Sequence, residues 1–162
     1  MKQNNAFTMS HAAMTAAVYV VLTTVGASIG FGPVQVRFAE ALTILPLFTP
    51  ASVPGLFVGC LIGNILGGAI LPDIIFGSLA TLIGAIGTRH LRNHPILATI
   101  PPIAANTIIV PFILKYGYSQ PLPIPAMMLT IGIGEVISCG VLGYGLYKIL
   151  TGYRHFIFRT IA

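Results

Sequence analysis

The stretch VRFAEALTILPLFTPASVPGLFVGCLIGN, residues 36–64, decides the fold class of this chain. It is apolar almost throughout, yet it carries Arg37 and Glu40 near its start and three prolines after them. Proline is tolerated at helix ends and in first turns. The prolines therefore predict a tight turn between two helices, with Ser52 capping the second helix. They are Pro46, Pro50 and Pro54.

The composition places the whole chain in a membrane. Of its 162 residues, 56% are hydrophobic and only 7% are charged, whereas soluble domains carry roughly 25% charged residues. We therefore expect an all-α integral membrane protein, with residues 1–162 forming a single six-helix membrane domain. The formal net charge is +5, but the basic residues fall at predicted helix ends. They form no patch, so no nucleic-acid partner is expected.

Six apolar segments, separated by charges and prolines, predict six transmembrane helices. The second segment is short, and segments of that length are often re-entrant or interfacial. The first segment is interpreted as a retained span, because only Lys2 precedes it and further apolar segments follow at once. The expected bounds are 8–30, 36–49, 52–71, 73–89, 95–115 and 122–150.

The distribution of basic residues supports six spans with both termini cytoplasmic. In that arrangement only Arg37 and Lys115 lie outside the cell. If the second segment instead dipped into the membrane and returned to the outer side, most basic residues would lie outside. Cytoplasmic loops are enriched in Lys and Arg, so six spans are favoured. The cytoplasmic set is Lys2, Arg89, Arg92, Lys148, Arg154 and Arg159.

Small residues recur at four-residue spacing in two of the predicted helices, where they allow close approach of helix backbones. In the third helix we expect this glycine stripe to pack inside the chain rather than at a dimer interface. In the first helix the alanine pairs are a weak signal for a partner helix. The residues are Gly55, Gly59, Gly63 and Gly67, with Ala12, Ala13, Ala16 and Ala17 in the first helix.

Polar groups from five predicted helices converge on the outer half of the bundle. An ionisable residue in a span costs on the order of 2.5–3.5 kcal/mol on insertion scales and usually faces a cavity or a partner. The convergence therefore predicts a ligand-binding site. Its candidate residues are Glu40, Asp73, Glu135, Asn64 and Asn106, with Arg37 at the rim, where it orients Glu40 or contacts the ligand.

Structural roles remain open for most of these residues. Glu40 can pair with Arg37, one turn earlier on the same face, and Asp73 can cap the helix that begins there. The two asparagines can hydrogen-bond between helices. Glu135 has no charged neighbour within a turn, so a role in ligand or proton binding is favoured.

Enzymatic motifs are not found. There is no nucleophile elbow, no phosphate-binding glycine loop and no HExxH pattern, and the four histidines fall at cytoplasmic ends. Cys60 and Cys139 lack metal-ligand spacing and are expected to be small packing residues. We therefore expect a chain with no catalytic residue, no cofactor and no metal.

The segments EALTILPLFTPASVPGLFVGCLIGN, DIIFGSLATLIGAIGT and IGEVISCGVLGYGLY resemble the QueT family over essentially the whole chain. QueT proteins are substrate-binding S-components of energy-coupling-factor (ECF) transporters, linked to uptake of queuosine precursors. The resemblance implies a six-helix subunit in a prokaryotic plasma membrane that binds its ligand from outside. Transport would then require the coupling subunit EcfT and two ATPases, with the alanine pairs as candidate coupling surface.

The resemblance also suggests how the polar residues would bind a 7-deazaguanine such as preQ1 or queuine. One carboxylate can accept the ring N–H and exocyclic amine together, and a second can hold a cationic side-chain amine. We assign Glu135 to the base edge, Glu40 or Asp73 to the ammonium, and Asn64 and Asn106 to the remaining polar edges. Aromatic cover would come from Phe31, Phe38 or Tyr116.

Three other functions remain open. The chain can be an S-component for another vitamin or heterocycle, although three carboxylates argue against an anionic ligand. It can also be a proton-coupled secondary carrier that uses Glu135 as its proton site. A structural subunit without a ligand ranks last, because it leaves the clustered carboxylates unexplained.

Overall fold

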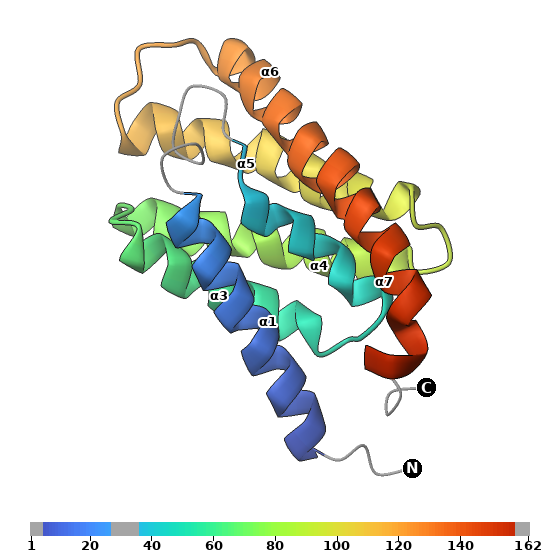
Figure 1. Ribbon diagram of the computed structural model, residues 1–162. Helices are drawn as coiled ribbons and strands as arrows, with labels where there is room; N and C mark the ends of the chain where they lie inside the picture. The colour runs from blue at the N-terminus through green and yellow to red at the C-terminus, as the bar shows by residue number, and fades with distance from the viewer. Residues whose placement is uncertain (1–4, 27–35, 158–162) are drawn as a thin grey trace.

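The computed structural model of the chain describes residues 5–26 and 36–157, with side chains up to Arg154. Lys2 and Arg159, which enter the topology argument, and the aromatic candidate Phe31 lie outside these residues. Within the described ranges the chain is helical and contains no strand (Figure 1). The start of α1 and the end of α7 lie at the same end of the bundle in this view.

The helical elements fall into six segments within the described residues, matching the six predicted apolar segments. Three of them are single elements, α1 (Asn5–Val25), η1 (Phe38–Leu47) and α3 (Ser52–Leu66). The others are composite: η2 (Asp73–Gly77) with α4 (Ser78–His90), η3 (Leu97–Thr99) with α5 (Ile100–Gly117), and α6 (Ile124–Glu135) with η4 (Val136–Gly143) and α7 (Tyr144–Ile157).

Three stretches in the described ranges are long and apolar enough to cross a membrane: Asn5–Val25, Leu97–Gly117 and Ile124–Arg154. Phe38–Leu47 and Ser52–Leu66 are shorter apolar helices. Large apolar side chains also cover the outside of the bundle, and Val21, Ile108 and Leu129 are each more than half exposed. An apolar exterior of this kind is what lipid requires, so the chain is a membrane protein built on helices.

The short second segment, η1, is a ten-residue 3₁₀-helix rather than an α-helix. Pro46 lies inside it, and in an α-helix a proline loses one hydrogen bond and clashes with the carbonyl four residues earlier. Because a 3₁₀-helix rises about 2 Å per residue, compared with 1.5 Å in an α-helix, ten residues reach about 20 Å. η1 therefore spans a greater distance than an α-helix of ten residues would.

The turn before α3 lies where the prolines predict it, but Ser52 does not cap the helix. The N-cap residue is Ala51, and no side-chain cap bond forms there among the described residues. Instead the Thr49 hydroxyl accepts a hydrogen bond from the Ala51 N–H at 3.2 Å. The expected cap is wrong because Ser52 is already inside the helix and its hydroxyl is buried.

The glycine stripe of α3 packs against α1 in the same chain, as predicted. A Cβ added at Gly55 would lie 2.6 Å from the backbone oxygen of Ala12, and one at Gly59 would lie 2.8 Å from Cβ of Tyr19. The contact buries Ala16, whereas Ala13 and Ala17 remain exposed on the other face of α1. Only the second alanine pair is therefore free to meet a partner helix.

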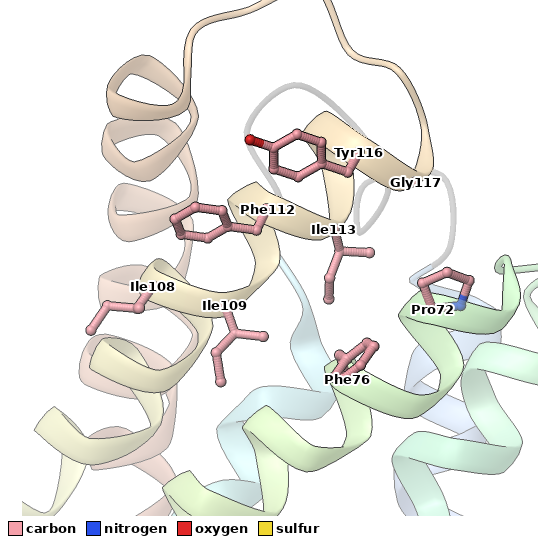
Figure 2. Close-up of a pocket in the computed structure, with 8 residues that line it drawn as sticks. All are labelled: Pro72, Phe76, Ile108, Ile109, Phe112, Ile113, Tyr116 and Gly117. Atoms are coloured by element: carbon pink, nitrogen blue, oxygen red, sulfur yellow. The ribbon is translucent and has the colours of Figure 1, made fainter.

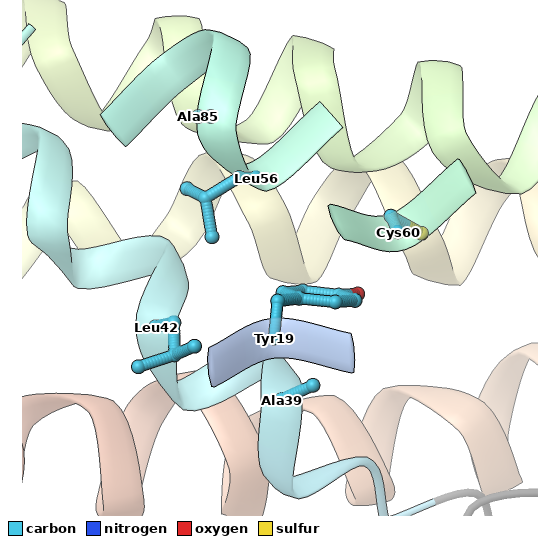
Figure 3. Packing of buried hydrophobic residues seen from close by; sticks show 6 residues of the cluster. All are labelled: Tyr19, Ala39, Leu42, Leu56, Cys60 and Ala85. Carbon is cyan, nitrogen blue, oxygen red and sulfur yellow. The ribbon is translucent and has the colours of Figure 1, made fainter. Parts of the chain in front are cut away.

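One buried apolar cluster ties the first four helical segments together (Figure 3). Tyr19 of α1 lies between residues of η1 and α3 in this cluster, and its side chain is 2% exposed. The phenol ring thus supports the packing while its hydroxyl reaches the polar residues described below. The cluster consists of Tyr19, Ala39, Leu42, Leu56, Cys60 and Ala85.

Candidate binding site

All the predicted polar candidates except Arg37 are buried inside the bundle. Buried polar groups nearly always have a hydrogen-bond partner. The contacts of each group therefore show whether all its polar atoms are already paired within the protein or whether one is left for a ligand. Arg37 is half-buried. The exposed fractions are 0% for Glu40, 2% for Asn64 and Asp73, and 3% for Asn106 and Glu135.

The Glu40 carboxylate is held by two other helices through one of its oxygens. Its Oε1 accepts hydrogen bonds from the Tyr19 hydroxyl of α1 and, at 3.3 Å, from the Thr81 hydroxyl of α4. Its Oε2 is buried and has no hydrogen-bond partner among the described residues. The surrounding helices therefore fix the carboxylate and leave one oxygen available.

Glu135 lies beside Glu40 and shares its surroundings with a cysteine. The Cys139 thiol, one helical turn further on, donates to Glu135 Oε2 at 3.2 Å and lies 3.5 Å from the backbone oxygen of Glu40. One ligand atom from each of Glu40, Glu135 and Cys139 lies within 4.8 Å of the others. Two carboxylates and a thiol thus form one compact buried cluster.

Asp73 forms a second polar group between η2 and the end of α5. Its Oδ2 accepts a hydrogen bond from the Tyr118 hydroxyl at 3.0 Å, and that hydroxyl accepts one from the Ile70 N–H at 3.2 Å. Burial raises the pKa of the Tyr118 phenol, so it stays protonated as a donor. Oδ1 of Asp73 is buried without a partner in the described part of the chain.

The predicted capping role of Asp73 is wrong. The residue before η2, Pro72, takes the cap position, and no side-chain cap bond is found there within the described residues. The carboxylate turns to Tyr118 instead, a contact between residues 45 positions apart. A local pattern cannot indicate a partner so distant in sequence.

The two asparagines differ in their contacts. Asn64 Nδ2 donates to the backbone oxygen of Asp73 at 3.4 Å and joins α3 to η2, as expected of an amide that links helices. Asn106 lies close enough to Glu135 to interact with its carboxylate, yet its Nδ2 makes no hydrogen bond of acceptable geometry to the described residues. The side-chain N–H of Asn106 is therefore available to donate a hydrogen bond to a ligand.

Arg37 interacts with the whole cluster rather than with Glu40 alone. Its guanidinium lies within electrostatic range of Asp73, Glu40 and Glu135. Its backbone N–H donates to the Ser138 hydroxyl at 3.1 Å. One guanidinium therefore lies near three carboxylates, so the acidic side chains of this cluster outnumber its arginine.

An apolar groove of about 430 Å³ lies between η2 and α5 (Figure 2). Tyr116 lines this groove and is 76% exposed, and Phe38, another aromatic candidate, is 39% exposed at the start of η1. The groove reaches the chain neighbours of the Asp73–Tyr118 pair, because its wall includes Pro72, which precedes Asp73, and Gly117, which precedes Tyr118. The lining residues are Pro72, Phe76, Ile108, Ile109, Phe112, Ile113, Tyr116 and Gly117.

Tyr19, Thr81 and Cys139 were missed as site residues from the sequence. Uncharged residues in apolar runs do not stand out by composition. Cys139 had one available signal, its spacing of four from Glu135, which places both side chains on one helix face. Tyr19 also had a spacing signal, because its spacing from Ala12 and Ala16 places it on the same face of α1, the face that meets α3.

The chain matches the family model described as QueT transporter over residues 9–152. It is similar to "Queuosine precursor transporter QueT" of Lactococcus lactis subsp. cremoris (strain MG1363), with 36% identity over 85 residues. That match covers 51% of this chain and 50% of the relative, so the chain spans about half the length of the curated relative it matches. No solved structure matches the chain significantly. Because the family model runs from α1 into α7, the chain belongs to the QueT transporter family.

Proposed function

We propose that this chain is the S-component of an ECF transporter for queuosine precursors. In this proposal the six helical segments span the plasma membrane of a prokaryote, with both termini cytoplasmic. The chain binds a 7-deazaguanine such as preQ1 or queuine from outside, and EcfT with two ATPases supplies the energy for import. Family membership and the name of the similar Lactococcus lactis protein support the substrate class.

One observation carries the substrate proposal. Three of the predicted binding residues each keep a buried polar atom without a partner among the described residues: Glu40 Oε2, Asp73 Oδ1 and Asn106 Nδ2. Leaving such an atom unpaired costs about 1–3 kcal/mol. A ligand that offers donors to two carboxylates and an acceptor to an amide would satisfy all three. A 7-deazaguanine with a side-chain amine has this set of groups.

The positions of the acids suggest which end of the ligand each one holds. Glu40 and Glu135 are too close together to contact opposite ends of a bicyclic base, so both are assigned to the edge with the ring N–H and exocyclic amine. The ring carbonyl neighbours that edge, and Asn106 neighbours Glu135, so Asn106 donates to the carbonyl. Asp73, outside this cluster, then holds the ammonium group.

The exposed face of α1 is the proposed docking surface for EcfT. Ala12 and Ala16 face α3, as the close approach to Gly55 and Gly59 shows. Ala13 and Ala17 are exposed on a helix whose Met14 is 57% exposed. Small exposed residues on a membrane helix allow a partner helix to approach closely.

The substrate proposal is tested by equilibrium binding to the purified chain in detergent, without partner subunits. The ligands are preQ1, queuine, preQ0 and guanine, with two unrelated vitamins as controls. We expect submicromolar binding of the amine-bearing deazaguanines and much weaker binding of preQ0, which lacks the ammonium. Tight binding of a vitamin instead would indicate an S-component for another heterocycle, and no binding of any deazaguanine would refute the assignment.

A second candidate, a proton-coupled carrier, is favoured by one feature. The Glu40–Glu135 cluster brings two buried carboxylates together, an arrangement in which one proton can be shared. Uptake into vesicles that contain this chain alone separates the two functions. A carrier would accumulate preQ1 when only a proton gradient is applied, whereas the S-component requires EcfT, the ATPases and ATP.

A further inference from the structure

We propose that Glu40, Glu135 and Cys139 form a binding site for a thiophilic divalent cation, Zn²⁺ or Cd²⁺. One ligand atom from each residue lies within 4.8 Å of the other two. The three side chains are 0%, 3% and 1% exposed. They come from two segments far apart in sequence, η1 and the junction of α6 with η4, so the fold assembles the cluster.

A second observation, independent of the clustering, also points to a cation as the ligand of this cluster. Oε1 of Glu40 is occupied by Tyr19 and Thr81, whereas Oε2 of the same fully buried carboxylate has no partner among the described residues. Buried charged groups are normally paired or coordinate metals. A cation bound to Oε2 would supply the partner that the surrounding residues do not.

The ligand types select the class of metal. Zn²⁺ binds thiolate sulfur at about 2.3 Å and carboxylate oxygen at about 2.0–2.2 Å, commonly with three protein ligands and one open position. Tetrahedral angles then place the ligand atoms about 3.3–3.7 Å apart. The Cys139–Glu135 pair is already at 3.2 Å. The remaining pairs lie within 4.8 Å and must close by up to about 1.5 Å to reach this range. Mg²⁺ and Ca²⁺ prefer six or more oxygen ligands, which a thiol does not provide.

Neighbouring groups hold the three ligands in place. The Thr43 hydroxyl lies 3.4 Å from Sγ of Cys139 and 2.6 Å from the backbone oxygen of Glu40. Tyr19 fixes the other end of the Glu40 carboxylate. On binding, the thiol of Cys139 loses to solvent the proton that it donates to Glu135, and a metal–sulfur bond forms without any change of oxidation state.

Cys60 provides a matched control. It is the other free cysteine, it is also fully buried, and it contacts the Thr81 hydroxyl at 3.4 Å and the Asn64 amide at 3.6 Å. It does not belong to the three-ligand group found in the described part of the chain. The two cysteines therefore differ in the one property on which the proposal depends.

The test is a Cd²⁺ titration of the purified full chain in detergent, with no deazaguanine present. Ultraviolet thiolate-to-Cd²⁺ charge-transfer absorbance and metal content after gel filtration give the readout. We expect one Cd²⁺ per chain for the wild type and for Cys60→Ser. For Cys139→Ser we expect no charge-transfer band and an affinity at least about tenfold lower.

Glu135→Gln keeps the thiol and tests the carboxylate, so the proposal does not depend on whether Cys139→Ser folds. Its affinity for Cd²⁺ should fall by about tenfold or more while a weaker charge-transfer band remains. The proposal is overturned if the wild type binds no stoichiometric Cd²⁺ or if Glu135→Gln binds like the wild type. It is also overturned if a folded Cys139→Ser keeps the band or if Cys60→Ser loses it.

This inference does not rest on the proposed function, because the titration contains no precursor. A chain that binds Cd²⁺ through Cys139 but no deazaguanine would keep the metal site and lose the proposed substrate. A chain that binds preQ1 but no Cd²⁺ would give the opposite result. If both sites exist they share Glu40 and Glu135, so saturating preQ1 should weaken Cd²⁺ binding.

Discussion

The hydroxyl of Tyr19 on α1 donates a hydrogen bond to Oε1 of Glu40 on η1. The same tyrosine ring packs in the buried cluster that joins α1 to η1, α3 and α4. A single side chain therefore links the packing of α1 to the orientation of a buried carboxylate. The opposite face of α1 carries the proposed docking residues Ala13 and Ala17, so this helix connects the binding site with the partner surface.

Tyr19→Phe should weaken preQ1 binding about tenfold. A hydrogen bond to a charged group contributes about 1.5–3 kcal/mol, and about 1.4 kcal/mol corresponds to a factor of ten in affinity. The ring stays in place, so the packing is retained. Tyr153→Phe, at an exposed position of α7, is the matched control, and calorimetric titration gives both affinities. Equal affinities for the two variants would show that Tyr19 does not position Glu40 for the ligand.

Asp73→Asn should separate preQ1 from preQ0. If Asp73 holds the ammonium, its loss costs about 2–5 kcal/mol for preQ1, the range for truncating one partner of a buried charge pair. The expected weakening is about thirtyfold or more at the lower end of that range. Binding of preQ0 should change little, because it has no ammonium. Competition binding with both ligands checks this, and an equal loss for both would assign the ammonium to another residue.

Gly59→Ala should lower the thermal stability of the chain. The added methyl would lie 2.8 Å from Cβ of Tyr19 and 3.0 Å from Cα of Ala16, and overpacking of this kind costs about 1–3 kcal/mol. Gly145→Ala is the control, since the described residues leave open space around its Cβ. A thiol-reactive dye reports unfolding through the two buried cysteines. Identical midpoints for the two variants would show that the α1–α3 contact is less tight than described.

Ala17→Trp should reduce assembly with EcfT and ATP-driven uptake while leaving preQ1 affinity unchanged. A large side chain on a face that packs closely against another helix prevents that approach. Val141→Trp, at a 64% exposed position of η4, places the same bulk on another exposed face. Co-purification with EcfT and uptake into cells are the readouts. Normal assembly of Ala17→Trp would exclude this face as the docking surface.

The helical framework was predictable because its signals are local. Apolar runs, prolines and small-residue spacing located six helical segments and indicated that the glycine stripe of α3 packs inside the chain. The structure confirms both within the described residues. The 3₁₀ form of η1 and the π-helical turns that follow Pro72 and Glu135 were not predicted. Pro46 disfavours an α-helix in η1 locally. The π-helical turns instead pack against α5 and η1, contacts that a single run of residues does not reveal.

The candidate site was predictable only in its charged and amide residues. The cost of burying Glu40 or Glu135 made them conspicuous in an apolar chain. Tyr19, Thr81 and Cys139 were not, because tyrosine, threonine and cysteine are ordinary residues of membrane helices. The Tyr118–Asp73 bond was also missed, since it joins residues that only the fold brings together.

We expect the buried polar cluster to bind a 7-deazaguanine through Glu135. Calorimetric titration of preQ1 into the purified wild type and Glu135→Gln tests it most directly. We predict submicromolar binding to the wild type and an affinity at least about a hundredfold lower for the variant, as expected when a charge-assisted bidentate pair is lost. Absence of preQ1 binding to the wild type, or equal affinity in both proteins, would contradict the claim.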